Sequence, residues 1–262
     1  MRQHEKAEAF RALHEGEPFL IPNPWDAGSA KVFQGLGFNA LATTSSGFAY
    51  TLGRADGRVT LDEVIDHVDQ LDAATDLPVS VDLENGYGRS PDEAARAIEA
   101  AAAAGAVGGS IEDFDAEDGI YPLDLSVERV AAAASAARAL PFPFTFTARA
   151  ENHIRGNPDL EDTVARLRAY EQAGADVLYA PGLSTAEEIR TVCDAVAKPV
   201  NVLARPDLTM AEIVEAGAHR VSLGGWLAFV AAGAMADVAG ALLETGDFSS
   251  LKVAARVDQW LD

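Results

Sequence analysis

The sequence predicts an α/β fold, and more closely a (β/α)8 barrel (TIM barrel) with extra helices at its N- and C-terminal ends. Short runs of β-branched or apolar residues recur eight times, and a helix-like stretch follows each of them. Polar and charged residues gather at the carboxyl ends of these runs, where such a barrel places its active site. A doubly wound open sheet is the alternative, but it rarely needs eight such regular units. No linker rich in Pro, Gly or Ser divides the chain, so we expect one barrel domain over residues 1–262.

The predicted strands are short segments such as "VSVDLE" and "FTFTARA". We expect them at 19–22, 40–45, 79–84, 108–113, 144–150, 177–181, 200–204 and 220–224. The helices expected between them cover 26–36, 61–75, 91–104, 126–139, 159–173, 185–196, 209–216 and 226–244. Ser90 is placed to cap a helix before Pro91, and acid-rich first turns follow Thr185 and Thr209. Glycine ends several helices just before a strand, as in "EQAGADVLYA", which is typical of a helix C-cap.

Two further helices are expected at the ends of the chain, in "MRQHEKAEAFRALHEGEPF" and in the amphipathic "SLKVAARVDQWLD". His4, His14 and His67 are expected on solvated helix faces. The stretch at 226–243, "WLAFVAAGAMADVAGALL", is apolar nearly all round, so it must be buried in its own core or in that of a partner. Burial in a partner predicts a homodimer or a homotetramer.

The chain is strongly acidic, with 41 Asp and Glu against 20 Lys and Arg and a formal net charge of −21. This charge repels phosphate backbones and anionic lipid, so we expect no nucleic-acid or membrane partner. No stretch approaches about 18 uncharged apolar residues, the length that spans a bilayer. The N-terminus lacks the apolar core of a signal peptide, and Cys193 is the only cysteine. These features predict a cytoplasmic protein.

Three carboxylates stand at the ends of predicted strands: Asp82 and Glu84 in "VDLENGYG", and Glu112 in "GGSIED". With no equal supply of Lys nearby they would repel one another unless a cation neutralised them. Oxygen ligands favour Mg²⁺ or Mn²⁺ over Zn²⁺, and Mg²⁺ keeps several waters, so one or two carboxylates need touch it directly. The alternative is a buried ion pair of Asp82 or Glu112 with Arg149.

Other polar residues at the strand ends are candidates for contact with the substrate. Arg149, at the end of the fifth predicted strand, offers a bidentate donor to a carboxylate or to a developing enolate. The "TSSG" turn, with Ser45, Ser46 and Gly47, offers hydroxyls and consecutive backbone N–H groups for another carboxylate. Asn201, in the seventh predicted strand, joins this set.

Four separated segments, "NPWDAGSAKVFQGLGFNALATTSSGFA", "VDLENGYG", "GAVGGSIED" and "TARAE", together resemble the isocitrate lyase/phosphoenolpyruvate mutase superfamily. They occur in the family's order and span roughly residues 18–230. The resemblance implies a (β/α)8 barrel, bound Mg²⁺, chemistry on 2-oxo acids or their enolates, and often an eighth helix swapped between subunits.

The resemblance also implies a role for each matching residue. Ser45, Ser46 and Gly47 are similar to the family's carboxylate-binding loop, and Asp56, in "GRADG", resembles an acid that contacts metal-bound water. Glu84 replaces the commoner Asp of the family's acidic pair. The expected catalytic residues are Arg149, Glu112 and Asp56. The expected substrate-binding residues are Ser45, Ser46, Gly47, Arg149 and Asn201. The expected metal ligands are Asp82, Glu84 and Glu112.

One segment departs from the family pattern. The family's lyases carry a lid of Lys-Lys-Cys-Gly-His type after the fourth strand, and its phosphonate-processing members carry a lid with lysine and asparagine. Here the segment is "FDAEDGIYPLDLS", residues 114–126, which is acidic and has no Lys, Cys, His or Asn. Cleavage of isocitrate or methylisocitrate by the usual acid–base pair is therefore not expected. A phosphorylated substrate would meet no cation beyond the metal and Arg149.

Decarboxylation or retro-aldol cleavage does not require the missing lid residues, because a metal and an arginine can stabilise a pyruvate-type enolate without them. We therefore expect a Mg²⁺-dependent carbon–carbon lyase or decarboxylase of a small 2-oxo or 2-hydroxy dicarboxylate, such as oxaloacetate or a substituted malate. Water, Tyr50, Tyr87 or Tyr121 are the candidates that would protonate the enolate. Two alternatives stay open: a phosphonate- or phosphoenolpyruvate-processing mutase or hydrolase of the same family, and a non-catalytic barrel that binds an oxo acid.

Overall fold

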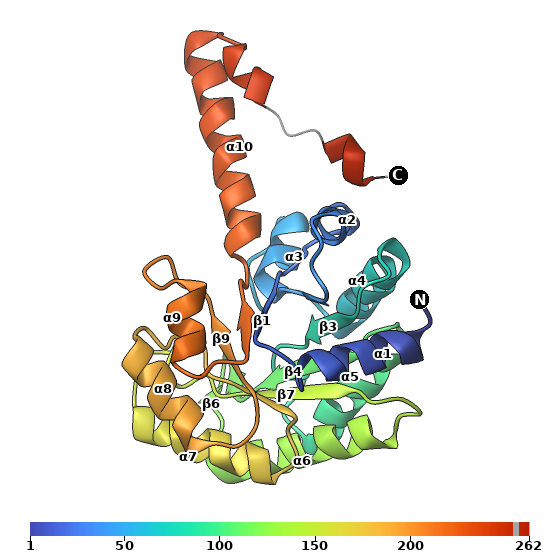
Figure 1. Cartoon of the computed structure of the whole chain (residues 1–262), viewed down its shortest axis with the longest axis vertical. Coiled ribbons are helices and arrows are strands. Elements are labelled where there is room, and N and C mark those ends of the chain that lie inside the picture. The colour runs from blue at the N-terminus through green and yellow to red at the C-terminus, as the bar shows by residue number, and fades with distance from the viewer. Residues whose placement is uncertain (254–256, 262) are drawn as a thin grey trace.

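Eight parallel strands form a nearly closed barrel in this computed structural model, which describes residues 1–253 and 257–261 (Figure 1). The strands lie side by side in the order β1-β10-β9-β8-β7-β4-β3-β2. Their bounds are β1 Phe19–Ile21, β2 Leu41–Ala42, β3 Val79–Asp82, β4 Gly108–Glu112, β7 Thr145–Arg149, β8 Val177–Tyr179, β9 Val200–Leu203 and β10 Arg220–Ser222. The backbone N–H of Ala42 donates to the carbonyl oxygen of Pro22 at 3.0 Å and so joins the two ends of the series. The predicted (β/α)8 barrel is confirmed.

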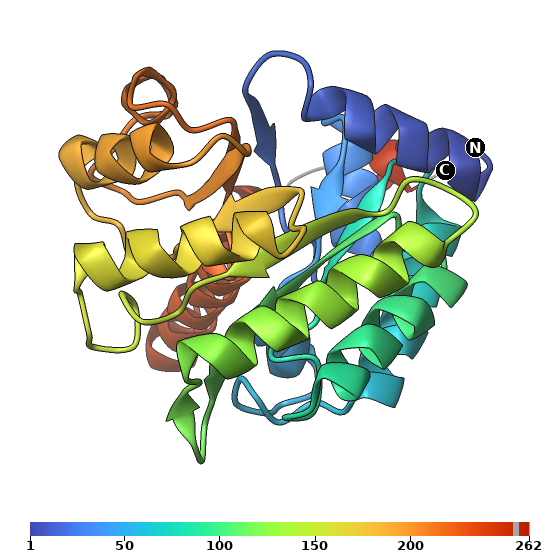
Figure 2. The ribbon, with the colours of Figure 1, turned by 90° about the horizontal axis from the view of Figure 1, so that it is seen from below.

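Helices cover the outside of the barrel (Figure 2). Their bounds are α1 Gln3–Leu13, α2 Ala27–Gly35, α3 Ser45–Thr51, α4 Leu61–Ala74, α5 Pro91–Ala103, α6 Leu123–Ala139, α7 Leu160–Gln172, α8 Ala186–Ala195, α9 Met210–Glu215 and α10 Trp226–Thr245. The predicted start signals are confirmed, because Ser90, Thr185 and Thr209 each accept a hydrogen bond from a backbone N–H three residues on. Buried Val, Ile, Leu, Phe and Ala side chains between the strands and these helices form the main core.

Two segments near the site differ from the prediction. The second strand is shorter than the expected 40–45, because Thr44 caps a short helix, α3, that starts at Ser45. The segment 114–126 begins with an antiparallel hairpin of β5 (Phe114–Asp115) and β6 (Gly119–Ile120) before it continues into α6. Both α3 and the hairpin are too short to show a hydrophobic period that can be read from the sequence.

Helix α1 packs across the amino-terminal ends of the strands, where Phe10 lies in a buried cluster with Ile21. Two histidines that were expected in solvent are largely withdrawn from it: His67 is buried and His14 is partly buried. The Nε2 of His14 accepts a hydrogen bond from Arg220 Nη1 at 3.2 Å, and burial lowers the pKa of His14 to about 3. Burial likewise lowers the pKa of His67 to about 4, since its ring stacks on Phe48 inside the protein.

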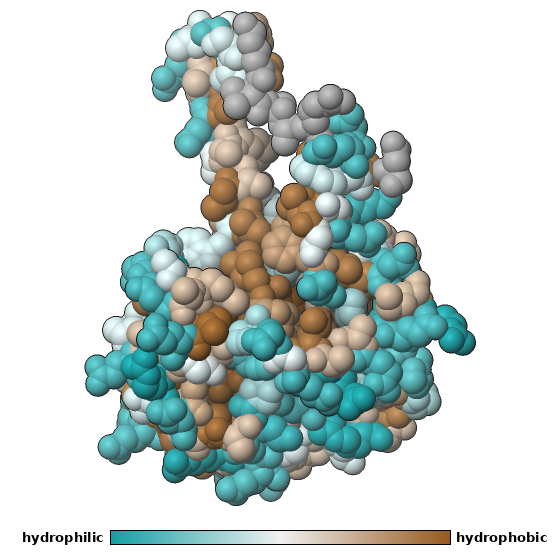
Figure 3. All heavy atoms as spheres, viewed as in Figure 1, coloured by the Kyte–Doolittle hydropathy of each residue, from teal (hydrophilic) through white to brown (hydrophobic). Residues whose placement is uncertain are grey.

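Helix α10 leaves the barrel and stands away from it (Figure 1). Only Ala228 among its residues is buried, whereas Val230 and Met235 are 63% and 62% exposed. Apolar surface continues from the lower half of the helix onto the adjoining barrel (Figure 3). In the part of the chain that the structure describes, α10 is the one helix long and apolar enough to cross a membrane, although Asp237 and Glu244 interrupt it.

The chain turns back beyond α10 toward α2 (Figure 1). The predicted C-terminal helix is replaced by two 3-10 turns, η1 (Ser249–Val253) and η2 (Val257–Trp260). Residues 254–256 and 262 of that predicted helix lie outside the described residues. Lys31 Nζ donates to the carbonyl oxygen of Leu261 at 2.8 Å and so connects this segment to α2.

Candidate active site

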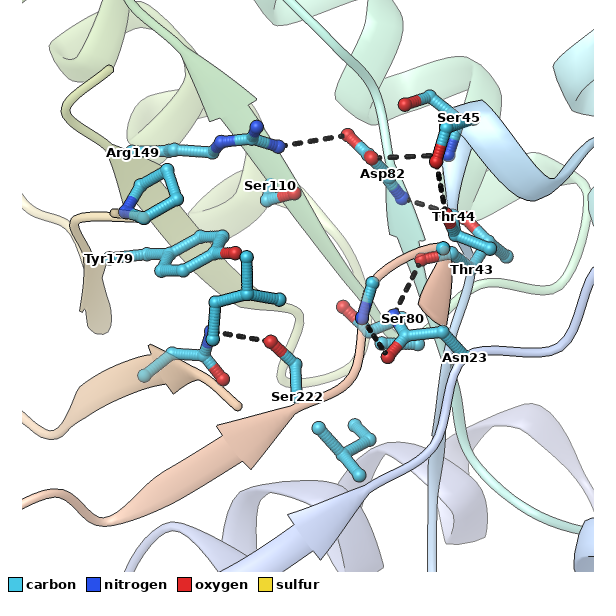
Figure 4. A pocket seen from close by; sticks show the side chains of 18 of the residues that line it. Asn23, Thr43, Thr44, Ser45, Ser80, Asp82, Ser110, Arg149, Tyr179 and Ser222 are labelled. Atoms are coloured by element: carbon cyan, nitrogen blue, oxygen red, sulfur yellow. Dashed lines mark hydrogen bonds and ion pairs between the residues drawn. The ribbon is translucent and has the colours of Figure 1, made fainter. Parts of the chain in front are cut away.

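A cavity of about 230 Å³ opens at the carboxyl ends of the barrel strands, and every barrel strand or the loop after it contributes to its lining (Figure 4). A second cavity of about 260 Å³ shares part of this lining, including Arg149. The predicted site residues divide between the two. The first cavity is lined by Ser45, Ser46, Asp56, Asp82, Arg149 and Asn201. The second is lined by Ser45, Asp56, Glu84, Glu112 and Arg149. Gly47 lines neither.

Arg149 is the centre of the charged part of the site. Its Nη1 lies 3.2 Å from Glu112 Oε2 and 3.8 Å from Asp82 Oδ1, and its Nε donates to Glu151. Burial alone would lower the pKa of Arg149, but the carboxylates of Glu112 and Glu151 raise it well above the usual value. The ion pair that the sequence left open is therefore present, and its arginine faces both cavities.

A second arginine, Arg155, lies in both cavities and was missed by the sequence analysis. Its Nε donates to Glu151 Oε2 at 2.8 Å, its Nη2 donates to Glu112 Oε1 at 3.4 Å, and its guanidinium lies 3.9 Å from the centroid of the Phe114 ring. The sequence analysis expected Arg149 to be the only cation here besides a metal ion. Arg155 is a second one, so that expectation is wrong. Arg155 lies in a loop beyond β7, and its spacing of four residues from Glu151 is the one sequence signal that could have indicated it.

The segment "VDLENGYG" turns away from β3 through left-handed backbone, because Glu84, Gly86 and Tyr87 have φ angles of 47°, 77° and 57°. The backbone N–H of Glu84 donates to Asp82 Oδ1 at 3.1 Å, while the Glu84 carboxylate faces the second cavity and accepts a hydrogen bond from the Tyr87 hydroxyl at 3.4 Å. Burial, and then the charges of Asp82 and Asp56, raise the pKa of Glu84 to about 7. The turn therefore concentrates negative charge beside Arg149.

The carboxylates of Asp82, Glu84 and Glu112, called the acidic group below, have the chemistry of a Mg²⁺ site. Every donor is a carboxylate oxygen, and burial raises the pKa of Glu112 although Arg149 opposes that shift. A divalent cation would relieve the mutual repulsion of such carboxylates. Among the described residues, no group of three or more His, Cys, Asp or Glu side chains is arranged to hold a metal ion, so the structure does not bring Asp82, Glu84 and Glu112 together around one point. The residues fit Mg²⁺, and the ligand roles of Asp82, Glu84 and Glu112 stay predictions.

The "TSSG" turn forms the first turn of α3. Thr44 Oγ1 accepts a hydrogen bond from the Gly47 N–H at 3.3 Å and lies 3.1 Å from the Ser46 hydroxyl oxygen. A Cβ at Gly47 would stand 2.6 Å from Thr44 Cγ2 and 3.4 Å from Ala228 Cβ, so glycine permits close packing at the base of α10. Ser45 and Ser46 face the cavity, and the expected contact of Gly47 with a substrate stays a prediction.

The tyrosines named as proton donors lie at different places. Tyr87 lines the second cavity, Tyr121 is buried beside the hairpin, and Tyr50 lies against α10. Tyr179, which the sequence analysis did not name, lines the first cavity with its hydroxyl turned inward (Figure 4). Burial raises the pKa of Tyr179 to about 12, so it keeps its proton at neutral pH.

The proteins to which this chain is similar in sequence and in structure agree with one another. The phosphoenolpyruvate phosphomutase family model matches residues 10–243. The 2-methylisocitrate lyase of Halalkalibacterium halodurans is 32% identical over 204 residues, which are 76% of this chain and 67% of that protein. The oxaloacetate decarboxylase of Bradyrhizobium sp. BTAi1 is 28% identical over 226 residues, 82% of this chain and 76% of that protein. A crystal structure from Burkholderia cenocepacia J2315, provisionally named a lyase/mutase, superposes with a TM-score of 0.96 at 50% identity and covers 98% of this chain and 96% of its own.

Proposed function

Because this chain belongs to the phosphoenolpyruvate mutase/isocitrate lyase superfamily, we propose that it is a Mg²⁺-dependent carbon–carbon lyase or decarboxylase of a small 2-oxo or 2-hydroxy dicarboxylate. Oxaloacetate and substituted malates are the substrates we would test first. The similarity to an oxaloacetate decarboxylase and to a 2-methylisocitrate lyase supports this choice. The observation that carries the proposal is Arg149, held by Glu112 and Asp82 at the mouth of a barrel cavity.

In this proposal, with oxaloacetate as the substrate, the bond between C3 and its carboxylate breaks, carbon dioxide leaves, and the electron pair of that bond passes into the enolate of pyruvate. The guanidinium of Arg149 faces the oxygen on which the negative charge develops, and the hydroxyls of Ser45 and Ser46 hold a substrate carboxylate. Mg²⁺, when bound beside the acidic group, would polarise the 2-oxo group. Tyr179 then donates its proton to the enolate carbon, because it is a protonated side chain in the same cavity.

Oxaloacetate consumption, followed by absorbance and by pyruvate formation, tests the proposal. The wild-type protein is measured with Mg²⁺ and again with EDTA, beside the variants Arg149→Met and Tyr179→Phe. We expect EDTA to abolish turnover and Arg149→Met to lower kcat by about 10²- to 10³-fold, the loss typical of one oxyanion donor. Tyr179→Phe should lower kcat by about 10²-fold and leave KM nearly unchanged. Arg96→Met, on the exposed surface of α5, is the matched control and should change neither value.

Two other results would contradict this proposal. Mg²⁺-dependent thermal stabilisation by oxalate without turnover of oxaloacetate or of substituted malates would leave a barrel that binds an oxo acid without catalysis. If oxalate and Mg²⁺ had no effect on the protein, the proposed metal site itself would be wrong.

A second candidate function has one observation in its favour. Arg155 adds a cation to the site and offers a partner to a phosphoryl or phosphonyl group. A mutase or hydrolase acting on phosphonopyruvate or phosphoenolpyruvate would use it. Conversion of phosphonopyruvate to phosphoenolpyruvate, or release of phosphate from it, that is lost in Arg155→Met but retained in Arg96→Met would favour this function over the first.

The assembly we propose is a homodimer or homotetramer in which α10 is buried by a second copy of the chain. The exposure of its apolar side chains supports this, since such side chains are normally covered. Asp237, at the middle of the helix, argues against burial in lipid, where a central Asp costs about 3 kcal/mol. A cytoplasmic location and the absence of nucleic-acid partners stay predictions from the sequence.

A further inference from the structure

The interior of this barrel is polar along one continuous row. Five side chains lie in register on neighbouring strands: Glu112, Arg149, Tyr179, Asn201 and Arg220. The first three end their strands, Asn201 is second in β9, and Arg220 begins β10, so the row runs from the mouth of the barrel to its floor. Barrels of this kind are normally filled with branched apolar residues. A polar row at this position therefore needs an explanation.

Arg220 is a charged group at the buried end of the row. Its side chain is 5% exposed, and no ion pair in the described part of the chain includes it. Its Nε donates to Asn201 Oδ1 at 2.8 Å and its Nη2 to Thr147 Oγ1 at 3.1 Å. Its Nη1 donates to His14 Nε2, which is therefore the unprotonated nitrogen of a neutral imidazole. All three partners are uncharged, so the positive charge is solvated by dipoles alone.

A charge buried without a counter-ion normally costs several kcal/mol. Each terminal nitrogen of Arg220 carries a second N–H, and no described residue is found to accept a hydrogen bond from either. Arg220 also lines the same cavity as Arg149 and the mouth residues. The same cavity is also lined by the hydroxyl-bearing side chains of Ser80, Ser110 and Ser222 (Figure 4). Its lining thus includes, in Arg220, a positive charge with free N–H donors and no acid among its hydrogen-bond partners.

We propose that Arg220 forms a second anion subsite at the floor of the active-site cavity, one that takes a carboxylate-sized anion. Two sources can supply this anion. The first is the far carboxylate of a dicarboxylate whose other end is held near Arg149, and this form rests on the proposed function. The second is a free inorganic anion such as chloride, which needs no assumption about the reaction. In the first form Arg220 selects for a ligand that carries negative charge at two separated points, and in the second it binds a single anion that competes with such a ligand.

Calorimetric titration of the protein with dicarboxylate ligands, in the presence of Mg²⁺, tests the subsite without requiring turnover. The probes are oxalate, malonate and succinate, each measured without added chloride and again with added sodium chloride. In Arg220→Met we expect malonate or succinate to bind at least tenfold more weakly, and oxalate to change by less than twofold. Arg220→Lys should recover part of the affinity, because it restores the charge but not the fork of donors. Arg96→Met is the matched control.

A chloride ion at Arg220 would show itself differently. Chloride would weaken the binding of the longer dicarboxylates to the wild-type protein, and crystals grown in bromide would show anomalous scattering beside the Arg220 guanidinium. The chloride and bromide measurements use the wild-type protein, so they test the inference even if Arg220→Met does not fold. No loss of affinity for either longer dicarboxylate, with no halide at Arg220, would overturn the inference. Failure of the proposed function is distinct, because oxaloacetate turnover would then be absent while anion binding remained.

Discussion

Among the single residues, Glu84 combines a strained backbone with a partly buried carboxylate. Its φ of 47° lies in the left-handed region, which costs a residue with a Cβ about 1 kcal/mol more than glycine. Its carboxylate is also held near Asp82 and Asp56, which raise its pKa. Such strain persists where the surrounding structure enforces it, and it is common at functional sites.

We predict that Glu84→Gly makes the protein more stable and less active. Both Glu84→Gly and Glu84→Ala remove the buried charge, but only glycine also relieves the backbone, so Glu84→Gly should be about 1 kcal/mol more stable than Glu84→Ala. Urea denaturation in EDTA measures this difference free of metal binding. Turnover of oxaloacetate should fall at least tenfold in both variants. Equal stability of the two variants would show that the left-handed backbone at residue 84 is not strained.

Among the elements, the hairpin β5–β6 stands where relatives in the family carry a Cys- or Lys-bearing lid, and it is held on several sides. Arg155 covers Phe114, Asn85 Nδ2 donates to Asp115 Oδ2 at 2.9 Å, and Arg89 pairs with Asp118. These contacts connect the hairpin to the loops after β3 and β7. The acidic segment is therefore an ordered wall of the second cavity, to which Phe114 and Asp115 contribute directly.

Helix α1 depends on one buried charge for its attachment to α4. Lys6 is almost fully buried, and its Nζ donates to Asp72 Oδ1 at 2.6 Å and to the carbonyl oxygen of Thr75 at 2.8 Å. Asp72 is partly exposed, so water moderates the energy of the pair. The contact nevertheless joins the amino-terminal helix to the barrel wall.

We predict that Lys6→Met lowers the free energy of unfolding by about 3 kcal/mol. The substitution leaves Asp72 and the Thr75 carbonyl without their shared donor in a mostly dry position. Chemical denaturation measures the loss, and Lys198→Met, at an exposed position, should change stability by less than about 0.5 kcal/mol. An unchanged midpoint for Lys6→Met would mean that α1 is held by apolar packing alone.

At the scale of the whole molecule, His67 and His14 make the free energy of unfolding depend on pH, because folding largely withdraws both from solvent. The pKa of His67 falls from 6.5 to about 4 on folding, and its Nε2 has no hydrogen-bond partner. The unfolded chain therefore binds more protons than the folded chain between these values, so the free energy of unfolding rises as pH rises from about 4 to 6.5. His14, with a pKa of about 3, acts in the same direction.

We predict that each of these histidines contributes a slope of up to about 1.4 kcal/mol per pH unit in that window. His67→Phe should remove one such slope, and it should also stabilise the protein at pH 7, because an unpaired buried nitrogen is replaced by a carbon. Denaturation midpoints of both proteins at pH 4.5, 5.5, 6.5 and 7.5 measure this. The carboxylates act equally in both proteins, so parallel curves would show that His67 does not titrate between folded and unfolded states.

Assembly is the second property of the whole molecule. Val230 and Met235 are more than half exposed on α10, so we predict that the double substitution Val230→Glu and Met235→Glu converts an oligomer to a monomer. Sedimentation velocity at micromolar concentration measures the change, and Arg96→Glu should leave the oligomer intact. A monomeric wild-type protein would contradict the proposed assembly. Binding of the wild-type protein to neutral phospholipid vesicles would instead assign α10 to a membrane.

The barrel, and the meeting of Asp82, Glu112 and Arg149 at its mouth, could be predicted from the sequence. Strand–helix alternation and capping signals such as Ser90 act over a few residues, so they can be read without the fold. Asp82, Glu112 and Arg149 were predictable as neighbours, because parallel strands end at one face of a barrel.

Only the tertiary structure decided which further side chains enter the cavity. Arg155 reaches it from a loop, and Arg220 starts its strand, at the end where no site is expected. His67 was expected in solvent because it falls on a helix that covers the barrel, yet its ring stacks on Phe48 from another helix. The physical reason is common to all three. Local sequence determines which element a residue occupies, but burial and charge partners depend on segments that are distant in the chain and meet only in the folded barrel.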